Sequence, residues 1–281
     1  MQIIKTVAEM KEFVKKARRQ GQTVGLVPTM GYLHEGHLTL MKQAKKECQV
    51  VVASIFVNPL QFGVGEDFET YPRDLTRDAE LAESVGVDAI FAPTAGEMYP
   101  KGYQTTVEVG ELANHLCGLS RPGHFKGVTT VVNKLFNIVQ PDKAFFGQKD
   151  AQQVLVLKRM AADLNMNLEL VTVPIVRESD GLAMSSRNVY LSPEERQAAL
   201  VLNRSLQAAR QWVHEGEKSG TRLRQRVVEF IEQEPLARID YVEVKSEETL
   251  ETAEVLEGSV LIALAVRFGN TRLIDNTVIT L

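Results

Sequence analysis

The stretch that decides the fold is Thr23–Met41, which reads Thr-Val-Gly-Leu-Val-Pro-Thr-Met-Gly-Tyr-Leu-His-Glu-Gly-His-Leu-Thr-Leu-Met. Its apolar run Val24–Val27 is typical of a buried strand. Pro28 and Gly31 interrupt the run, and apolar residues return with helical spacing from His34 onward. The stretch therefore predicts a strand, a turn and a helix in succession.

Two histidines stand at the start of this predicted helix. His34 and His37 are three residues apart, so they share a face of the first turn, where backbone N–H groups have no partner within the helix. Gly36 leaves the surface between them without a side chain, so a ligand can approach the backbone. A helix N-terminus with two additional donors suits a polyphosphate.

Two other interpretations of the histidine pair stay open. A zinc site of the metalloprotease kind has its histidines four residues apart in His-Glu-x-x-His, and it needs further ligands. The chain has five histidines and two distant cysteines, so we expect no metal bound by protein residues. The pair could also serve only to cap the helix. We favour the phosphate site.

The bulk composition is that of an ordinary globular protein. The chain has 281 residues, of which 44% are hydrophobic and 24% charged, so it can bury a substantial core in one large domain or two unequal ones. The net charge of −4 and the absence of a block of basic residues argue against a nucleic-acid surface. An acidic protein that binds a polyphosphate must concentrate its cations locally.

The cysteines and the N-terminus indicate the compartment. Cys48 and Cys117 form no Cys-x-x-Cys pair, which fits a reducing cytosol. Met1–Lys5 does not begin a signal peptide, and no apolar run approaches the length of a membrane span. We expect a soluble, cytoplasmic protein without membrane partners.

Strand and helix patterns alternate along the first part of the chain, which predicts a doubly wound α/β domain with a parallel, Rossmann-like sheet. The near-continuous β-branched run at Val50–Val57 is typical of a strand covered on both faces. Thr105–Val109 alternates and predicts an edge strand or hairpin. The other expected strands are 88–92, 144–146 and 168–173, and the expected helices are 6–19, 73–84, 127–139 and 150–164.

The pattern changes near residues 177–188, a polar stretch that contains Gly181. A long helix begins at Ser192-Pro193-Glu194-Glu195, and a second one covers about 221–234. Strand-like runs follow at 239–244, 260–268 and 273–279, the last two joined by a probable hairpin at Gly269-Asn270. We therefore expect a Rossmann-like N-terminal domain at 1–176, a smaller α+β domain at 177–281, and a hinge at 177–188.

Four blocks of sequence, in order, resemble a known family. His34-Glu35-Gly36-His37 resembles the H-x-G-H signature of the adenylate-forming nucleotidyltransferase superfamily, which includes class I aminoacyl-tRNA synthetases. With its flanking Pro28–Gly31 and with Asn58–Phe62, it resembles specifically the pantothenate synthetase (pantoate–β-alanine ligase) family. The resemblance continues through Phe146–Asp150 and Met184–Asn188, so it covers most of the chain.

The resemblance implies a two-step reaction. Pantoate and ATP would form pantoyl adenylate and pyrophosphate, and β-alanine would then displace AMP to give pantothenate. ATP would arrive with Mg²⁺ that keeps most of its waters, so no protein cage for the metal is required. The resemblance also implies a homodimer formed through the N-terminal domain.

The same resemblance implies which residues contact ATP and which take part in the chemistry. His34, His37 and Lys149 are the expected catalytic residues, with His37 either a proton donor or an electrostatic stabiliser of the leaving pyrophosphate. The expected ATP-binding residues are Met30, Gly31, Tyr32, Leu33, His34, Glu35, Gly36, His37, Gly147, Gln148, Lys149, Asp150, Val176, Met184, Ser185, Ser186 and Arg187.

Neutral amides are expected to hold the acid substrate. Asn58, Gln61 and Gln153 match the family's pantoate contacts, and Gln61 also matches its β-alanine contact. Amides hydrogen-bond hydroxyls and a carboxylate without neutralising the reacting anion. Phe62 and Met30 could pack on the substrate's methyl groups or could be ordinary core residues. Arg121 is a lesser candidate for binding an anion.

The second block of ATP contacts departs from the superfamily's K-M-S-K-S pattern. Ala183 replaces its first lysine, and Arg187 stands in the region of the second. This departure agrees with pantothenate synthetases and argues against a tRNA synthetase. The two serines and the guanidinium could hold phosphates as part of a lid, or the segment could be a serine-rich linker.

Two other functions stay open at this stage. A nucleotidyltransferase would transfer AMP or CMP to a phosphate ester and need no amine, and a regulatory module would bind nucleotide without turnover. Motifs of three other enzyme classes are missing from the sequence: the phosphate-binding P-loop, the dinucleotide-binding glycine fingerprint and the nucleophile elbow of serine hydrolases.

Overall fold

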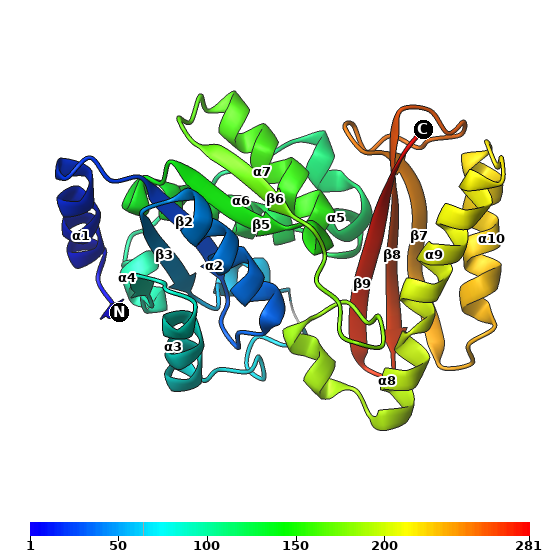
Figure 1. Ribbon diagram of the computed structural model, residues 1–281, viewed down its shortest axis with the longest axis horizontal. Helices are drawn as coiled ribbons and strands as arrows, with labels where there is room; N and C mark the ends of the chain where they lie inside the picture. The colour runs from blue at the N-terminus through cyan, green and yellow to red at the C-terminus, as the bar shows by residue number, and fades with distance from the viewer. Residues whose placement is uncertain (64) are drawn as a thin grey trace. The chain divides into compact units, whose positions relative to one another are not determined.

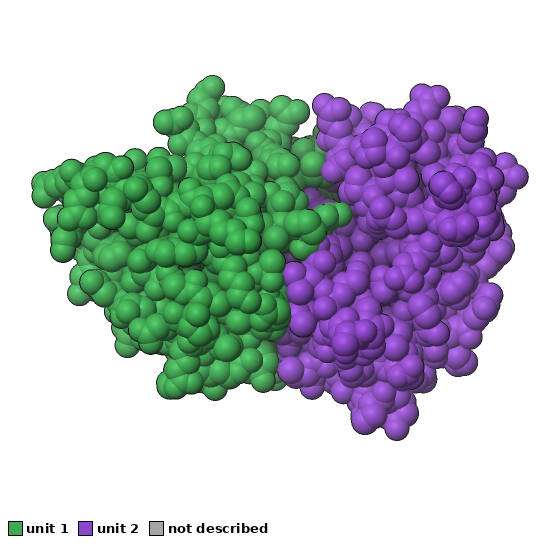
Figure 2. All heavy atoms as spheres, viewed as in Figure 1, with its two compact units in different colours: residues 1–113, 121–148, 152–174 green, residues 114–120, 149–151, 175–281 purple. Residues whose placement is uncertain are grey.

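The computed structural model describes residues 1–63 and 65–281, which divide into two compact units (Figures 1 and 2). Unit 1 comprises residues 1–113, 121–148 and 152–174. Unit 2 comprises residues 114–120, 149–151 and 175–281. The domain limits expected from the sequence, with a hinge at 177–188, stay a prediction.

Unit 1 is built on a six-stranded parallel sheet in the order β1-β4-β3-β2-β5-β6 (Figure 1). Its inner strands are buried along most of their length, which explains their continuous apolar runs. The doubly wound α/β architecture expected from the sequence is confirmed. The strands are β1 (Gln2–Ile4), β2 (Val24–Thr29), β3 (Val50–Ile55), β4 (Ala89–Phe91), β5 (Lys143–Gly147) and β6 (Glu169–Val173).

Helices cover both faces of this sheet. Helices α2 (Glu35–Glu47) and α3 (Leu75–Ser84) pack on one face, where Met41 and Ala82 share a core with Val27. Helices α1 (Val7–Arg19) and α6 (His124–Val139) pack on the other, where the rings of Phe136 and Phe146 meet edge to face. The remaining helices of this region are α4 (Ala95–Met98) and α7 (Ala151–Asp163), with the short η2 (Glu111–Asn114) at its border.

Parts of unit 1 differ from what the sequence predicts. Residues 105–109 form no strand: the Val107 N–H donates to Thr130 Oγ1 (2.9 Å), and the Val107 carbonyl accepts from Thr129 Oγ1 (2.6 Å). Side chains of α6 thus take the backbone bonds that a partner strand would supply. The edge strand β1 was not expected, because three residues are too few to show a period.

Unit 2 has a three-stranded antiparallel sheet in the order β7-β8-β9, backed by helices. Phe268 pairs with Thr271, and Gly269 adopts a left-handed φ of +56°, so the predicted hairpin at Gly269-Asn270 is confirmed. The elements are α5 (Leu116–Ser120), α8 (Pro193–Ala199), α9 (Val201–His214), α10 (Gly220–Glu232), β7 (Ala237–Ser246), β8 (Ser259–Phe268) and β9 (Thr271–Thr280).

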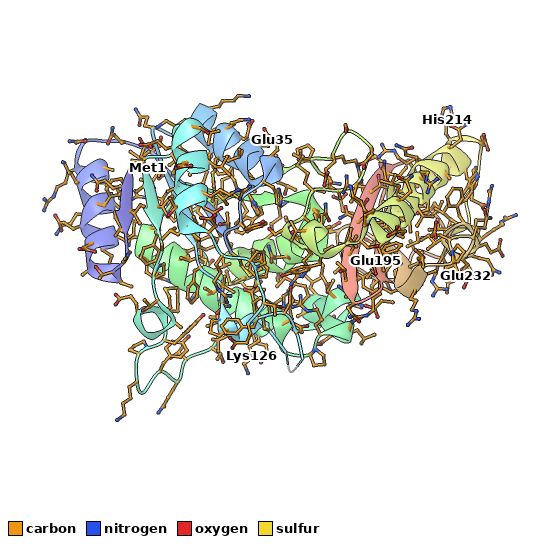
Figure 3. All side chains as sticks on the ribbon, turned by 90° about the horizontal axis from the view of Figure 1, so that it is seen from below. Met1, Glu35, Lys126, Glu195, His214 and Glu232 are labelled. Atoms are coloured by element: carbon orange, nitrogen blue, oxygen red, sulfur yellow. The ribbon has the colours of Figure 1, made fainter. Side chains whose placement is uncertain are left out.

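The first long helix of unit 2 begins as its sequence predicts. Ser192 and Glu195 form a reciprocal capping box, and Glu195, labelled in Figure 3, lies at the start of α8. The helical run is divided at Leu200, so the expected single helix is α8 followed by α9. In the described part of the chain, no helix combines the length and apolar character needed to cross a membrane.

Candidate active site

The order of strands in unit 1 indicates a ligand site at the end of β2. This strand pairs with β3 on one side and β5 on the other, and the chain proceeds outward from it in both directions. In open α/β sheets, ligands bind beyond the carboxyl ends of the strands at such a switch point. The segment Met30–His37 follows β2 directly, Asn58–Gln61 follows β3, and Gly147 ends β5. The sheet therefore gathers three of the predicted blocks at one edge.

The histidine pair caps helix α2 reciprocally. His34 is the N-cap residue, and its Nδ1 accepts the Gly36 N–H at 3.1 Å. The Nδ1 of His37 accepts the N–H of His34 at 3.4 Å, and the centroids of the two rings lie 4.0 Å apart. Because both Nδ1 atoms accept backbone N–H groups, a neutral ring in this geometry carries its proton on Nε2. The cap thus sets both Nε2–H groups as donors at the N-terminus of α2, so the capping and phosphate-binding interpretations are compatible.

A buried carboxylate on α3 shapes the loop that leads to the histidines. Asp78 is 1% exposed, and its two oxygens accept the N–H groups of Tyr32 and Leu33, each at 2.7 Å. Burial raises the pKa of Asp78, while the two amides and the neighbouring Arg77 oppose that rise. The loop needs this support because Tyr32, which has a Cβ, adopts a left-handed φ of +50°, whereas Gly31 adopts its φ of +85° without steric cost.

Gly31 fits that loop closely. A Cβ there would lie 2.9 Å from Ile55 Cγ2 and 3.0 Å from an oxygen of Asp78, so a side chain would push the loop away from α3. The sequence analysis did not identify Asp78. Its one visible sign is an acidic residue inside the apolar pattern of Leu75, Ala79 and Ala82.

Asn58 is a fully engaged polar residue at the start of the turn η1 (Pro59–Gln61). It is 1% exposed, and its Oδ1 accepts from the Leu60 N–H (3.3 Å) and from the Tyr99 hydroxyl (2.8 Å). Its Nδ2 donates to the Gly127 carbonyl and to Gln61 Oε1, both at 3.1 Å. The side-chain amide of Asn58 is thus occupied by protein groups on every side.

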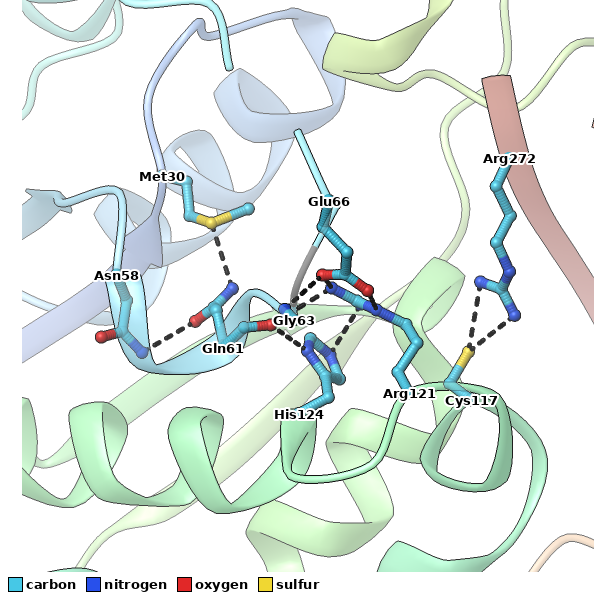
Figure 4. Close-up of polar contacts among 9 residues, drawn as sticks. All are labelled: Met30, Asn58, Gln61, Gly63, Glu66, Cys117, Arg121, His124 and Arg272. Carbon is cyan, nitrogen blue, oxygen red and sulfur yellow. Dashed lines mark hydrogen bonds and ion pairs between the residues drawn. The ribbon is translucent and has the colours of Figure 1, made fainter. Parts of the chain in front are cut away.

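Gln61 is half-buried and held by Asn58 on its oxygen side. Its Nε2 lies 3.1 Å from the sulfur of Met30, which belongs to the loop after β2 (Figure 4). The two predicted substrate-site segments, after β2 and after β3, are therefore in contact. Phe62, the next residue, packs edge to face against the rings of Phe68 and Tyr71.

A charged group holds the chain beyond Gln61 against the start of α6. Arg121 donates from Nε and Nη2 to the two carboxylate oxygens of Glu66, at 2.7 and 2.6 Å (Figure 4). Its Nη2 also donates to the Gln61 carbonyl at 3.2 Å, and its Nη1 lies 3.1 Å from His124 Nε2. His124 Nδ1 lies 2.8 Å from the same carbonyl. We call Glu66, Arg121 and His124 the clasp. Burial raises the pKa of Glu66, but Arg121 and the Gly63 amide outweigh burial and bring it to about 2. Arg121, expected as a possible anion site, thus binds an anion of the protein itself.

The block after β5 is divided between the units. Gly147, Gln148 and Gln153 belong to unit 1, and Lys149 and Asp150 to unit 2. Residues Gln148–Asp150 form the short turn η3 ahead of α7. Within unit 2, the Asn276 amide donates to the Lys149 carbonyl at 2.9 Å, which fixes the backbone at the predicted catalytic lysine.

The second predicted ATP block lies in unit 2 at the end of a tight hairpin. Arg177 and Ala183 form an antiparallel bridge, and the Met184 N–H donates to the Val176 carbonyl at 3.0 Å. Arg177 binds the buried Asp275 through two bonds of 2.7 and 2.9 Å. Ser185 then caps η4 (Ser186–Tyr190). The segment is thus an ordered hairpin with its own anchors, which is not expected of a serine-rich linker.

The family model described as "Pantoate-beta-alanine ligase" matches residues 2–278. The chain belongs to the pantoate–β-alanine ligase family. The resemblance that rested on four short blocks is therefore confirmed over almost the whole chain.

Curated relatives and solved structures agree with this assignment. A pantothenate synthetase of Pelotomaculum thermopropionicum is 63% identical over 279 residues, and one of Heliobacterium modesticaldum is 62% identical; each alignment covers 99% of both chains. The crystal structure of pantothenate synthetase from Thermus thermophilus superposes with a TM-score of 0.94 at 48% identity and 99% coverage of each chain. The pantoate–β-alanine ligase of Francisella tularensis, described as complexed with β,γ-ATP and β-alanine, has a TM-score of 0.80 at 33% identity, covering 99% of this chain and 97% of that one.

Proposed function

We propose that this chain condenses (R)-pantoate with β-alanine to form pantothenate, a coenzyme A precursor, in an ATP-dependent and AMP-forming reaction. Family membership over residues 2–278 supports the overall reaction. The observation that carries the proposal is the reciprocal cap of His34 and His37 at the N-terminus of α2, which follows β2 at the edge where parallel-sheet enzymes bind ligands. The two Nε2–H groups would donate to phosphate oxygens there.

In this proposal the phosphates of ATP bind at the start of α2. The backbone of Met30–Leu33, Glu35 and Gly36 would lie against the nucleotide, and His34 and His37 would donate to phosphate oxygens. Lys149 would add a positive charge, with Gly147, Gln148, Asp150 and Val176 beside it. From the hairpin of unit 2, Met184–Arg187 would bring two hydroxyls and a guanidinium to the phosphates. The Francisella tularensis complex, which is described as holding an ATP derivative, supports a nucleotide site in this family.

Mg²⁺ would accompany the nucleotide. Among residues 1–63 and 65–281, no group of three or more His, Cys, Asp and Glu side chains could hold a metal ion. Mg²⁺ on nucleotides is usually held by phosphate oxygens and water, so the proposal requires no cage of protein ligands. The ion would neutralise charge on the leaving pyrophosphate, while the protein residues position the reactants.

Amides would hold the acid substrate. We propose that Gln61 and Gln153 hydrogen-bond pantoate, that Gln61 also contacts β-alanine, and that Asn58 acts on the substrate through Gln61. The internal hydrogen bonds of Asn58 support this indirect role.

The chemistry proceeds in two displacements. A carboxylate oxygen of pantoate attacks the α-phosphorus of ATP, the bond from that phosphorus to the bridging oxygen breaks, and pyrophosphate leaves. The β-alanine nitrogen then attacks the acyl carbon, the bond from that carbon to the AMP oxygen breaks, and the nitrogen gives up a proton. His34 and His37 stabilise the charge that develops in the first step, so they need not transfer a proton to a leaving group as good as pyrophosphate. Positioning supplies much of the remaining acceleration.

We also propose a cytoplasmic homodimer formed through the N-terminal domain. The family resemblance supports the dimer, and the thiols of Cys48 and Cys117, which form no disulfide in the described part of the chain, suit a reducing compartment. No nucleic-acid or membrane partner is proposed.

Labelled oxygen tests the reaction directly. Pantoate with ¹⁸O in its carboxylate should transfer one labelled oxygen to AMP, because the carboxylate oxygen that attacks phosphorus stays with it when the amine displaces AMP. ATP–pyrophosphate exchange should also require pantoate. Unlabelled AMP, or exchange in the absence of pantoate, would contradict the ligase reaction and favour a different nucleotidyl transfer.

A further inference from the structure

The orientation of the Asn58 side-chain amide follows from its backbone neighbours. The oxygen and the nitrogen of a side-chain amide are nearly equal in size, so which of them occupies each position must be decided from the hydrogen-bond network. The Leu60 N–H can only donate, so the atom that faces it is Oδ1. The Gly127 carbonyl can only accept, so the atom that faces it is Nδ2. Two backbone groups thus fix the Asn58 amide.

That assignment determines the orientation of Gln61. The second N–H of Asn58 Nδ2 points to the Gln61 amide at 3.1 Å and can only meet an acceptor, so Oε1 of Gln61 faces Asn58. The Nε2 group of Gln61 is consequently turned to the side of Met30, in the loop after β2. Gln61 therefore presents a hydrogen-bond donor toward the loop after β2, which contains Met30.

Tyr99, at the end of α4, is the third residue in this series of hydrogen bonds. Its hydroxyl lies 2.8 Å from Asn58 Oδ1, an acceptor, so the hydroxyl must donate. Burial raises the pKa of Tyr99, with a smaller contribution from Tyr103, so the phenol keeps the proton that it donates. The ring is held between Phe56 and Tyr103, and the ammonium of Lys134 lies 5.7 Å from its centroid.

We propose that Tyr99 is a positioning residue for the acid substrate, which it orients through Asn58 and Gln61. The hydroxyl of Tyr99 holds the oxygen of Asn58, the nitrogen of Asn58 holds the oxygen of Gln61, and the nitrogen of Gln61 donates to the substrate. This inference rests on the proposed role of Gln61 in binding pantoate. The packing of α6 supports the rigidity of the relay, because a Cβ at Gly127 would lie 2.2 Å from the Leu60 carbonyl oxygen.

The test compares two neighbouring tyrosines. Tyr99→Phe removes the donating hydroxyl and keeps the ring, whereas Tyr103→Phe removes a hydroxyl from the ring packed against it. In pantoate-dependent ATP–pyrophosphate exchange, Tyr99→Phe should raise the KM for pantoate about fivefold, the effect of losing one net hydrogen bond. The KM for ATP should stay close to the value of Tyr103→Phe. Equal pantoate KM values for the two variants would overturn the relay.

Gln61→Ala separates this inference from the proposed function. If Gln61→Ala leaves the pantoate KM unchanged, the assignment of Gln61 to the acid site fails. If it raises that KM while Tyr99→Phe matches Tyr103→Phe, only the relay fails. A measurement on the wild-type protein needs no variant to fold: the ¹⁵N order parameter of the Gln61 side-chain amide should match the rigid backbone, and free rotation of that amide would overturn the proposal.

Discussion

Single residues at the start of α2 combine capping with chemistry. The Nδ1 atoms of His34 and His37 are occupied by backbone N–H groups, so in the proposed site the Nε2–H groups would be the donors to ligand. A cap made of glutamate or aspartate would satisfy the same backbone groups and repel phosphate. Histidine satisfies the helix end and still offers a donor, which accounts for this residue type at both positions.

The variant His37→Ala tests this donor role. It should lower the rate of pantoate-dependent ATP–pyrophosphate exchange by about 10²- to 10³-fold, the effect of losing one donor to a developing anion. The unfolding free energy should fall by no more than about 1 kcal/mol, because the lost cap bond is long. His214→Ala, at the exposed end of α9, is the matched control and should leave both quantities unchanged. Full exchange activity in His37→Ala would refute the assigned role.

Asp78 supports the loop before the histidines from a different element. Asp78→Asn puts an NH₂ group against one of the two backbone N–H groups of Tyr32 and Leu33, so one buried donor loses its acceptor. The unfolding free energy in urea should fall by about 2 kcal/mol. Glu80→Gln, an exposed change on the same helix, should shift it by less than about 0.5 kcal/mol. Equal effects of the two changes would show that Asp78 does not support the loop.

The sequence revealed some of these residues and concealed others. His34, His37 and Gln61 follow strand-like runs, so their place at the carboxyl edge of the sheet could be inferred from order alone. Asp78 lies on a helix and acts on a loop 45 positions away in sequence, and no periodicity reports such a contact. Tyr99 is hidden for the same reason, because its partner Asn58 belongs to another element.

At the scale of elements, the clasp joins the chain after β3 to the N-terminus of α6. Glu66 and Arg121 have side chains 26% and 18% exposed, so solvent screens their pairing only in part. The N-cap of α6 is Gly123, which has no side chain to cap the helix. The clasp therefore holds the start of α6 to the chain after β3 through side-chain bonds of Arg121 and His124, because the N-cap residue Gly123 has no side chain to make one.

The clasp predicts a stability change in acid. The pKa of Glu66 is about 2 in the folded protein and close to 4.3 in the unfolded chain. The contribution of Glu66 to the unfolding free energy is therefore complete at pH values well above 4.3 and is lost as the pH falls toward 2. Near neutral pH, Glu66→Gln should lower the unfolding free energy by about 2 kcal/mol. The difference between variant and wild type should shrink as the pH falls below about 4.

An exposed ion pair provides the control for the clasp. Arg159 and Asp163 lie four residues apart on α7 with more than half of each side chain exposed, so Asp163→Asn should change stability by less than about 0.5 kcal/mol. A Glu66→Gln effect as small as this, or one that does not depend on pH, would contradict the pairing of Glu66 with Arg121.

Elements with local chemistry were predictable, and elements with distant partners were not. The start of α8 follows from Ser192, Pro193 and Glu195, and the β8–β9 hairpin follows from Gly269-Asn270, because each depends on neighbouring residues. Thr105–Val109 alternates as a strand does, but its backbone is bonded by threonines of α6. The alternating pattern is present in the sequence, but it does not reveal which groups bond the backbone, so the predicted strand was wrong.

At the scale of the whole molecule, the alternation of strands and helices was enough to predict a parallel sheet, and that prediction is confirmed. What the sequence could not give is the membership of unit 2, which takes in residues 114–120 and 149–151 as well as 175–281. These two short segments differ too little in composition from their neighbours to be recognised in the sequence. They belong to unit 2 because of their tertiary contacts. Unit 2 carries Lys149 and the hairpin before Ser185.

The central claim is that the start of α2, at the carboxyl edge of the sheet, binds the triphosphate of ATP and directs its α-phosphorus to an organic acid. The most direct measurement is a crystal structure of the protein with a non-hydrolysable ATP analogue, Mg²⁺ and pantoate. We expect the phosphates within hydrogen-bond distance of Nε2 of His34 and His37, and the pantoate carboxylate between the α-phosphorus and Gln61. A triphosphate bound away from both imidazoles would contradict the account.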